Sequence, residues 1–306
     1  MSDDDRTKPD TRLYVLQARK APRAVIFRRG PSKQVRLVLW DTARDRFLPG
    51  QWLKGRVYER RSDLSPDGRY LAYFAAKHKP DGPPTWTAVS RPPYFTAIAL
   101  WPKTDAWGGG ALFKDDKTLL LNHHEWNMKV QTDGWRNPPI RVRPLGDSPG
   151  AGEDDPIWSM RLERDGWKLV QEGETHEDDR ETADIWIRYD PPEVWRRAAP
   201  KRQHRLELEM RLCGIRERGG AWYVIEYSIV GAGDERVDLG RADWADWCRT
   251  SGDLLFARDG KIQRLPVDGA LPDPARANAL TDLSDQTFEE MEPPPEALEW
   301  GGRIHW

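Results

Sequence analysis

The stretch Asp63-Leu64-Ser65-Pro66-Asp67-Gly68-Arg69-Tyr70-Leu71-Ala72-Tyr73 decides the fold. It holds a turn from Ser65 to Gly68 directly before an apolar run. Pro66 fixes φ early in that turn, and Gly68 accepts the positive φ that follows. The sequence therefore predicts a turn that opens onto a β-strand at Arg69.

The same arrangement returns at a fixed interval along the chain. Asp67, Asp116 and Asp165 are 49 residues apart, and each ends a turn before a hydrophobic run. A repeat of this length fits one four-stranded blade of a β-propeller. Tryptophans and proline pairs follow in nearly the same register, at Trp86, Trp135, Trp186, Pro92-Pro93, Pro138-Pro139 and Pro191-Pro192.

These landmarks predict an all-β chain that forms a single β-propeller over residues 12–306, with about 49 residues per blade. Residues 1–11 are predicted to be a disordered tail. Six blades fit the register, and five are the alternative because the last interval is short. Either 13–16 or 303–306 would complete the ring. The six units are expected at 13–53, 61–102, 107–145, 157–195, 206–239 and 243–271.

The segment 63–73 resembles the repeat of the Tol-type and WD-like β-propellers, in which a strand, a Ser-Pro-Asp-Gly turn and a second strand form the inner hairpin of a blade. The segment 244–265 resembles a second copy, with Ser251-Gly252-Asp253 in the turn. The resemblance implies a propeller fold. It implies no activity, since propellers host binding and catalysis alike.

Composition favours a cytoplasmic protein. The chain has 306 residues, of which 38% are hydrophobic and 32% charged, and its 16 tryptophans supply large apolar surfaces for a core. The acidic N-terminus lacks an apolar signal-type stretch, and no run approaches the roughly 18 apolar residues of a membrane span. Two cysteines are too few for a disulfide framework. The abundance of Arg, Pro and Trp suggests a bacterial source.

Charge is spread unevenly, although the net charge is −2. Residues 1–61 carry a net charge of +9, and residues 151–195 carry −9. A solvated surface is the simpler interpretation, and a docking surface for another protein is the sharper one. The basic stretch lacks interleaved aromatic residues or a known motif, which argues against nucleic-acid binding.

Three polar loops are the predicted partner-binding surface. If each loop follows the second strand of its blade, the segments 77–84, 122–127 and 172–180 should emerge on one face of the ring. Four of the six histidines lie in these loops. Loops on a rigid scaffold often carry function. The residues predicted to bind a partner protein are His78, His124, Trp126, His176 and Asp178.

The sequence offers a metal site as a weaker alternative. His123 with Glu125 would suit zinc or iron, but the chain has no His-Glu-x-x-His spacing. The acidic run 172–181 lacks the spacing of a calcium loop.

Carbohydrate cleavage is a further alternative. Paired carboxylates lining a propeller channel could cleave sugars, with Asp63, Asp243 and Asp246 as candidates. The chain contains no Ser nucleophile elbow, phosphate loop or dinucleotide fingerprint.

We therefore predict a non-catalytic interaction or scaffold module without a cofactor or metal. It would be a monomeric ring or part of a hetero-complex, and it would not bind membranes. The alternative is an enzyme, either a metal-assisted hydrolase at the histidine loops or a carbohydrate-active propeller using the central channel.

Overall fold

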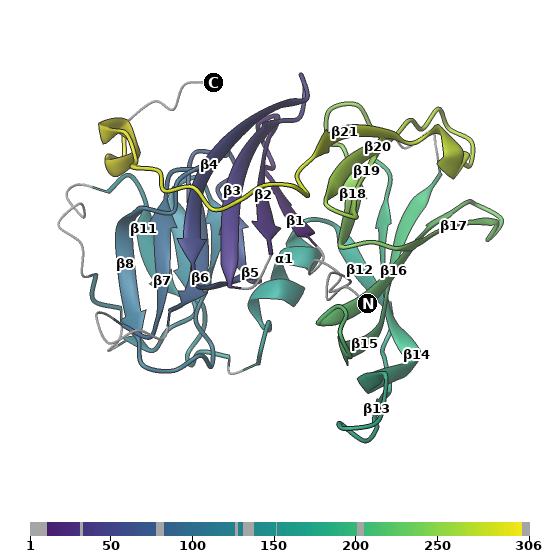
Figure 1. Ribbon diagram of the computed structural model, residues 1–306, viewed down its shortest axis with the longest axis horizontal. Helices are drawn as coiled ribbons and strands as arrows, with labels where there is room; N and C mark the ends of the chain where they lie inside the picture. The colour runs from purple at the N-terminus through teal and green to yellow at the C-terminus, as the bar shows by residue number, and fades with distance from the viewer. Residues whose placement is uncertain are drawn as a thin grey trace, which may run out of the picture. The chain divides into compact units, whose positions relative to one another are not determined.

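The computed structural model describes residues 11–30, 33–77, 83–125, 128–130, 138–150, 152–200 and 205–301. The chain divides into two compact units. Unit 1 comprises residues 1–161 with 283–306, and unit 2 comprises residues 162–282. Figure 1 shows the strands of both units. The fold is all-β, built from several antiparallel sheets.

Unit 1 begins with two four-stranded antiparallel meanders. The sequence predicts strands in these two places, as the first two blades of the repeat. Sheet A has the strand order β1-β2-β3-β4, and sheet B has the order β5-β6-β7-β8. Because β1 pairs with β2, residues 13–16 belong to the first sheet. The strands are β1 (Arg12–Gln17), β2 (Arg23–Arg29), β3 (Gln34–Asp41), β4 (Arg46–Lys54), β5 (Arg56–Leu64), β6 (Leu71–Ala76), β7 (Thr85–Ser90) and β8 (Ala97–Lys103).

The core of unit 1 explains why β6 is apolar throughout and does not alternate. Leu71, Tyr73 and Ala75 belong to a core cluster shared with sheet A. Ala72, on the opposite face of the strand, belongs to a second cluster shared with β9 and β10 of sheet C. Every residue of β6 is buried. Each fully buried large apolar side chain contributes about 1.5–3 kcal/mol to stability.

Sheet C departs from the simple meander. It contains β9 (Ala111–Asp115), β10 (Thr118–Leu121) and β11 (Arg141–Pro144) in the order β11-β10-β9. β9 and β10 form the predicted hairpin around Asp116. β11 pairs with β10 in parallel, so the chain crosses back before it re-enters the sheet.

The segment after residue 282 returns to unit 1 and runs along it, as the yellow trace in Figure 1 shows. The guanidinium of Arg28 donates to the carbonyl oxygens of Leu283 and Ser284 at 3.0 and 2.7 Å. Further along, the hydroxyl of Tyr70 donates to the carbonyl oxygen of Trp300 at 2.5 Å. Near the start of the described chain, the hydroxyl of Thr11 donates to the carbonyl oxygen of Ser284 at 3.2 Å. Of the predicted tail, residues 1–10 lie outside the described residues, as do residues 303–306.

Unit 2 holds two sheets. Sheet D has the order β12-β14-β15-β16-β17, with β13 also paired to β14, and sheet E has the order β18-β19-β20-β21. Sheet D joins the expected fourth and fifth units, so the described residues form five sheets where the register predicts six units. The strands are β12 (Trp167–Gln171), β13 (Thr175–Glu177), β14 (Ile185–Ala198), β15 (Glu207–Glu217), β16 (Tyr223–Val230), β17 (Arg236–Arg241), β18 (Trp244–Trp247), β19 (Leu254–Arg258), β20 (Lys261–Leu265) and β21 (Asn278–Asp282).

A helix stands where the repeat predicts a strand before the turn at Asp165. Residues Ile157–Arg164 form α1, with Ile157, Trp158 and Leu162 buried. Buried positions at this spacing follow the helical period of 3.6 and not the strand period of 2. Two short 3-10 helices are Pro274–Arg276 and Pro295–Leu298. No helix within the described ranges is both long and apolar enough to span a membrane.

Gly50 should be intolerant of any side chain, because a Cβ built there would lie 2.0 Å from the carbonyl oxygen of Pro93. We expect Gly50→Ala to lower the free energy of unfolding by about 1–3 kcal/mol through overpacking. Gly146→Ala is the matched control, since its Cβ would meet nothing nearer than Ser148 at 3.8 Å. Denaturant titration of tryptophan fluorescence measures both, and equal effects would contradict this packing.

Candidate binding surface

The predicted histidine loops of unit 1 are partly described. His78 and Trp126 lie outside the described residues. His124 is half-buried after β10, and Glu125 is exposed. His123 is buried, and its Nε2 lies 2.8 Å from Oγ1 of Thr87 in a hydrogen bond. This contact ties the end of β10 to β7, so His123 has a packing role.

The candidate metal site gains no support from this geometry. His123 is buried and Glu125 is exposed, so the two side chains lie in different environments. Within the described ranges, no three His, Cys, Asp or Glu side chains gather as a metal site would require. Both cysteines carry free thiols, with Cys248 buried and Cys213 half-buried.

His176 and Asp178 lie together on a projecting part of sheet D. We call this part the arm: residues 172–190, which include β13 and the start of β14, with residues 214–217 of β15. His176 pairs across the strands with Arg188, and its Nε2 makes a 2.9 Å hydrogen bond to the carbonyl oxygen of Asp190. All three residues of β13 are exposed. Figure 1 shows β13 at the far end of sheet D.

Contacts within the arm hold its side chains in place. Arg188 hydrogen-bonds and ion-pairs with Asp178, which lowers the pKa of that carboxyl. The guanidiniums of Arg180 and Arg216 lie 4.9 and 5.4 Å from the ring centre of Trp186. The indole N–H of Trp186 donates to the Glu177 carboxylate at 3.0 Å. Cation–π contacts of this kind give an exposed hairpin a defined shape.

Strand order changes the position of the loop that carries His176. The repeat makes this loop the connection after the second strand of its blade. In the structure, β12 is the edge strand of sheet D, and the loop joins it through β13 to β14. The cause is α1, which replaces the expected first strand. The loop therefore follows the first strand of its sheet, whereas the loop of His124 follows the second strand of sheet C.

The polar face of sheet D carries a group of charged residues that the repeat pattern does not indicate. Glu209 is almost fully buried, with a side chain that is 3% exposed. Arg196 Nε donates to one of its oxygens at 2.8 Å, and Arg236 Nη2 donates to the other at 2.8 Å. The sequence of β15 does indicate that Glu209 lies on this face. Leu208, Met210 and Leu212 alternate with the residues that face away from the core.

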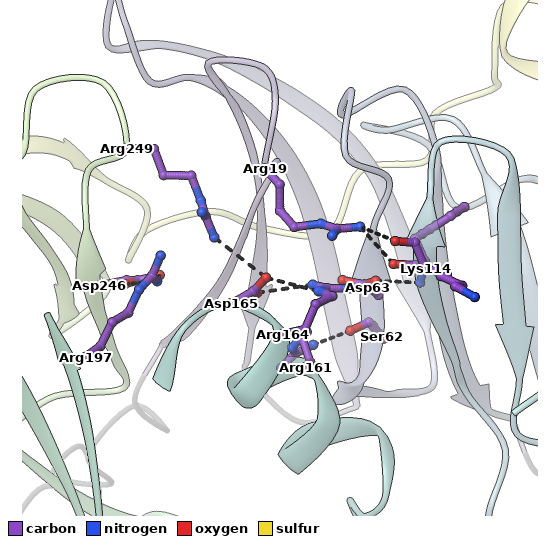
Figure 2. A network of polar contacts seen from close by, with 11 residues as sticks. Arg19, Ser62, Asp63, Lys114, Arg161, Arg164, Asp165, Arg197, Asp246 and Arg249 are labelled. Carbon is purple, nitrogen blue, oxygen red and sulfur yellow. Dashed lines mark hydrogen bonds and ion pairs between the residues drawn. The ribbon is translucent and has the colours of Figure 1, made fainter. Parts of the chain in front are cut away.

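Buried ion and hydrogen-bond networks account for two of the proposed sugar-cleaving acids. In unit 1, the Asp63 carboxylate accepts the backbone N–H of Phe113 at 2.7 Å, a contact from β5 to β9. In unit 2, Asp246 pairs with Arg197 and also accepts the N–H of Trp247 at 2.8 Å. Figure 2 shows both carboxylates, with Arg197 beside Asp246. These contacts give both acids structural roles.

Asp165, the third register point, anchors a separate group in unit 2. Arg164 hydrogen-bonds it in a two-pronged contact at 3.1 Å, and Arg249 lies 3.7 Å away (Figure 2). Burial alone would raise the pKa of Asp165. The charge and hydrogen bonds of Arg164, with the charge of Arg249, outweigh burial and hold the pKa below its ordinary value.

Comparison with known proteins yields little. No protein-family model matches the chain, and no curated protein matches it. An uncharacterised protein from Listeria monocytogenes EGD-e has 10% identity and a TM-score of 0.30, over 94% of this chain and 88% of its own. A "putative 6-phosphogluconolactonase" from Bacteroides fragilis NCTC 9343 has 10% identity and a TM-score of 0.31, over 92% of this chain and 98% of its own. Likenesses this low bear on neither fold nor function.

The lowered pKa of Asp165 predicts an acid-sensitive contribution to stability. A carboxyl with a folded-state pKa below its unfolded value stabilises the fold above the unfolded pKa, near 3.9, and loses this contribution as pH falls through the folded pKa. We expect Asp165→Asn to lower the free energy of unfolding at pH 7 by about 1–3 kcal/mol. The difference from the unmodified protein should shrink towards pH 2.

Urea titrations from pH 7 to pH 2 measure this effect. Asp282→Asn is the control, because this exposed carboxylate pairs with an exposed lysine and should change little. A constant deficit of the Asp165 variant across the whole pH range would contradict the assigned ion pairs.

Proposed function

We propose that the sheets are blades of one β-propeller of the Tol-type or WD-like kind. Three features of unit 1 support this. Sheets A, B and C follow one another along the chain, and their first strands are neighbours, since β1 contacts β5 and β5 contacts β9. The turns at Asp67 and Asp116 also lie near each other, because Lys20 bonds to both. Its backbone N–H donates to the carbonyl oxygen of Pro66 at 2.8 Å, and its Nζ donates to the Asp116 carboxylate at 2.7 Å. Five blades fit the sheets better than six.

On this scaffold we propose that the protein is a non-catalytic interaction module. The observation that carries the proposal is the arm of sheet D. It is exposed, it projects from its sheet, and it holds two of the predicted partner-binding residues, His176 and Asp178. A hairpin fixed by internal contacts loses little conformational freedom when a partner binds it.

Charge defines the partner. Residues 172–190 contain eight Asp or Glu and two Arg, for a net charge of −6. Such a surface fits a partner protein with a basic patch, which it would steer and orient more than it would hold tightly. His78, His124 and Trp126 belong to unit 1, and we propose them as a separate set of partner contacts on the preceding blades. The proposed place of action is the cytoplasm.

The arm should be needed for partner capture. We expect His176→Ala combined with Asp178→Ala to reduce capture of a stoichiometric partner at least about tenfold, because the hairpin loses its paired acidic surface. The measurement is affinity purification of the tagged protein from its own cells, with mass spectrometry of bound proteins and metals. The unfolding midpoint should stay unchanged, since both side chains lie at the surface.

A matched pair of substitutions separates the arm from general surface charge. Lys261→Ala with Asp282→Ala removes an ion pair of similar exposure from sheet E in the same unit. This control should capture the partner normally. Equal capture by all three proteins would refute the placement of the surface. A stoichiometric metal without a protein partner would instead favour the enzyme alternative.

A further inference from the structure

The polar face of sheet D has an open pocket of about 570 Å³ near the base of the arm. Its volume lies in the range of small-molecule sites. The lining includes three guanidinium groups, those of Arg196, Arg211 and Arg236, and the carboxylate of Glu209. It also includes four apolar residues, which we call the apolar wall: Val170, Pro191, Pro192 and Val194.

The three arginines are placed by the sheet itself. Arg196 lies directly opposite Glu209 across β14 and β15, and Arg211 lies opposite Val194 in the next pair. Glu209 accepts from both Arg196 and Arg236 at 2.8 Å. These bonds use one N–H of each guanidinium and fix its plane. The remaining N–H groups are held in a fork geometry that suits planar bidentate recognition of a carboxylate or phosphate.

The Arg211 side chain donates a single hydrogen bond to the described residues. Its Nε is buried and makes no hydrogen bond within the described part of the chain. The nearest carboxylate oxygen of Glu209 lies 3.9 Å from this Nε, beyond hydrogen-bond distance. Its Nη2 donates to Glu226 at 3.2 Å. A buried donor without an acceptor is costly and calls for an explanation.

The apolar wall is also a built feature. The pairing of β12 with β14 shifts register between Leu169 and Gln171, which leaves Val170 out of the pairing. Val170 is 52% exposed and lines the pocket. The side-chain amide of Gln171 donates to the carbonyl oxygen of Pro192 at 2.7 Å and ties the two sides of this wall together. Bulges commonly re-aim side chains in this way.

We propose that this pocket binds a small organic anion, a carboxylate or phosphate monoester that carries an apolar group. The anionic group lies against the guanidiniums of Arg211 and Arg236, whose side chains are 26% and 36% exposed. The apolar group covers Val170 and the prolines. Glu226 pairs with Arg211, and Glu207 lies 3.9 Å from Arg196, so together with Glu209 three glutamates balance the three arginines. Recognition therefore depends on directed donors and has only moderate salt dependence.

Isothermal titration calorimetry of the full chain tests the proposal with hexanoate and hexyl phosphate as probes. Hexylammonium, 1-hexanol and inorganic phosphate are the comparison ligands. We expect binding of one or both anionic probes and at least about tenfold weaker binding of the three comparison ligands. Preference for hexanoate or for hexyl phosphate distinguishes a carboxylate from a phosphate ligand.

Variants localise the binding. Arg211→Gln and Arg236→Gln should each weaken the preferred probe about tenfold or more, since each removes charged hydrogen-bond donors. Val170→Asp tests the apolar wall at an exposed position where folding is not at risk. The added carboxylate should weaken binding of the anionic probe by repulsion. Arg241→Gln is the control, because that residue is 54% exposed, lies outside the pocket and pairs with Glu217.

Several results would overturn the proposal. These are the absence of binding by both anions at millimolar concentration, equal binding of hexylammonium, or unchanged affinity in all three pocket variants. Inorganic phosphate binding as tightly as hexyl phosphate would overturn the role of the apolar wall. Because the pocket is tested with small ligands alone, its failure would leave partner capture by the arm unaffected.

Discussion

Hydrogen bonds from buried arginines to backbone carbonyl oxygens are the contacts on which unit 1 depends. Arg61 is 2% exposed and donates to the carbonyls of Ala106, Gly108 and Glu153. Arg161 on α1 donates to the carbonyl of Ser62 and, at 3.2 Å, to that of Glu59 (Figure 2). The carbonyls of Glu59 and Ser62 lie where the β5–β6 pairing shifts register, and those of Ala106, Gly108 and Glu153 lie in loops. Charged donors make such bonds strong enough to offset the desolvation of each guanidinium.

The charged residues of the molecule fall into two groups, buried ones that hold the fold together and others on sheet D. Several buried ionic groups of unit 1 tie β5 to its neighbours, Asp63 among them. In unit 2, Arg197 and Asp246 have the same kind of role. The charges of the arm and of the pocket on sheet D are different, because they lie on surfaces that face solvent. The proposed binding function rests on these charges of sheet D.

The sequence predicts the first two sheets well, and for physical reasons. Short apolar runs separated by Pro and Gly turns set strand positions locally, as at Pro66 and Gly68, and little tertiary information is needed. The prediction is wrong at α1 because the register at Asp165 outweighs the helical spacing of Ile157, Trp158 and Leu162. For the same reason, the predicted position of the His176 loop in its blade is wrong.

Other features could not be predicted from one sequence. An arginine in a polar segment is indistinguishable from a solvated one until the fold brings carbonyls around it, as it does for Arg61. The group around Glu209 needs the pairing of β14 with β15 and of β16 with β17, which pattern alone does not supply. The two anchors of the arm, Arg180 and Arg216, likewise meet at Trp186 only after β14 and β15 pair.

Small-angle X-ray scattering of the purified chain tests the central claim, that the sheets are blades of one propeller, most directly. A closed ring of 306 residues should have the radius of gyration of a compact domain, about 19 Å, with a single-peaked distribution of interatomic distances. A clearly larger radius with a two-peaked distribution would show two separate bodies and contradict the propeller.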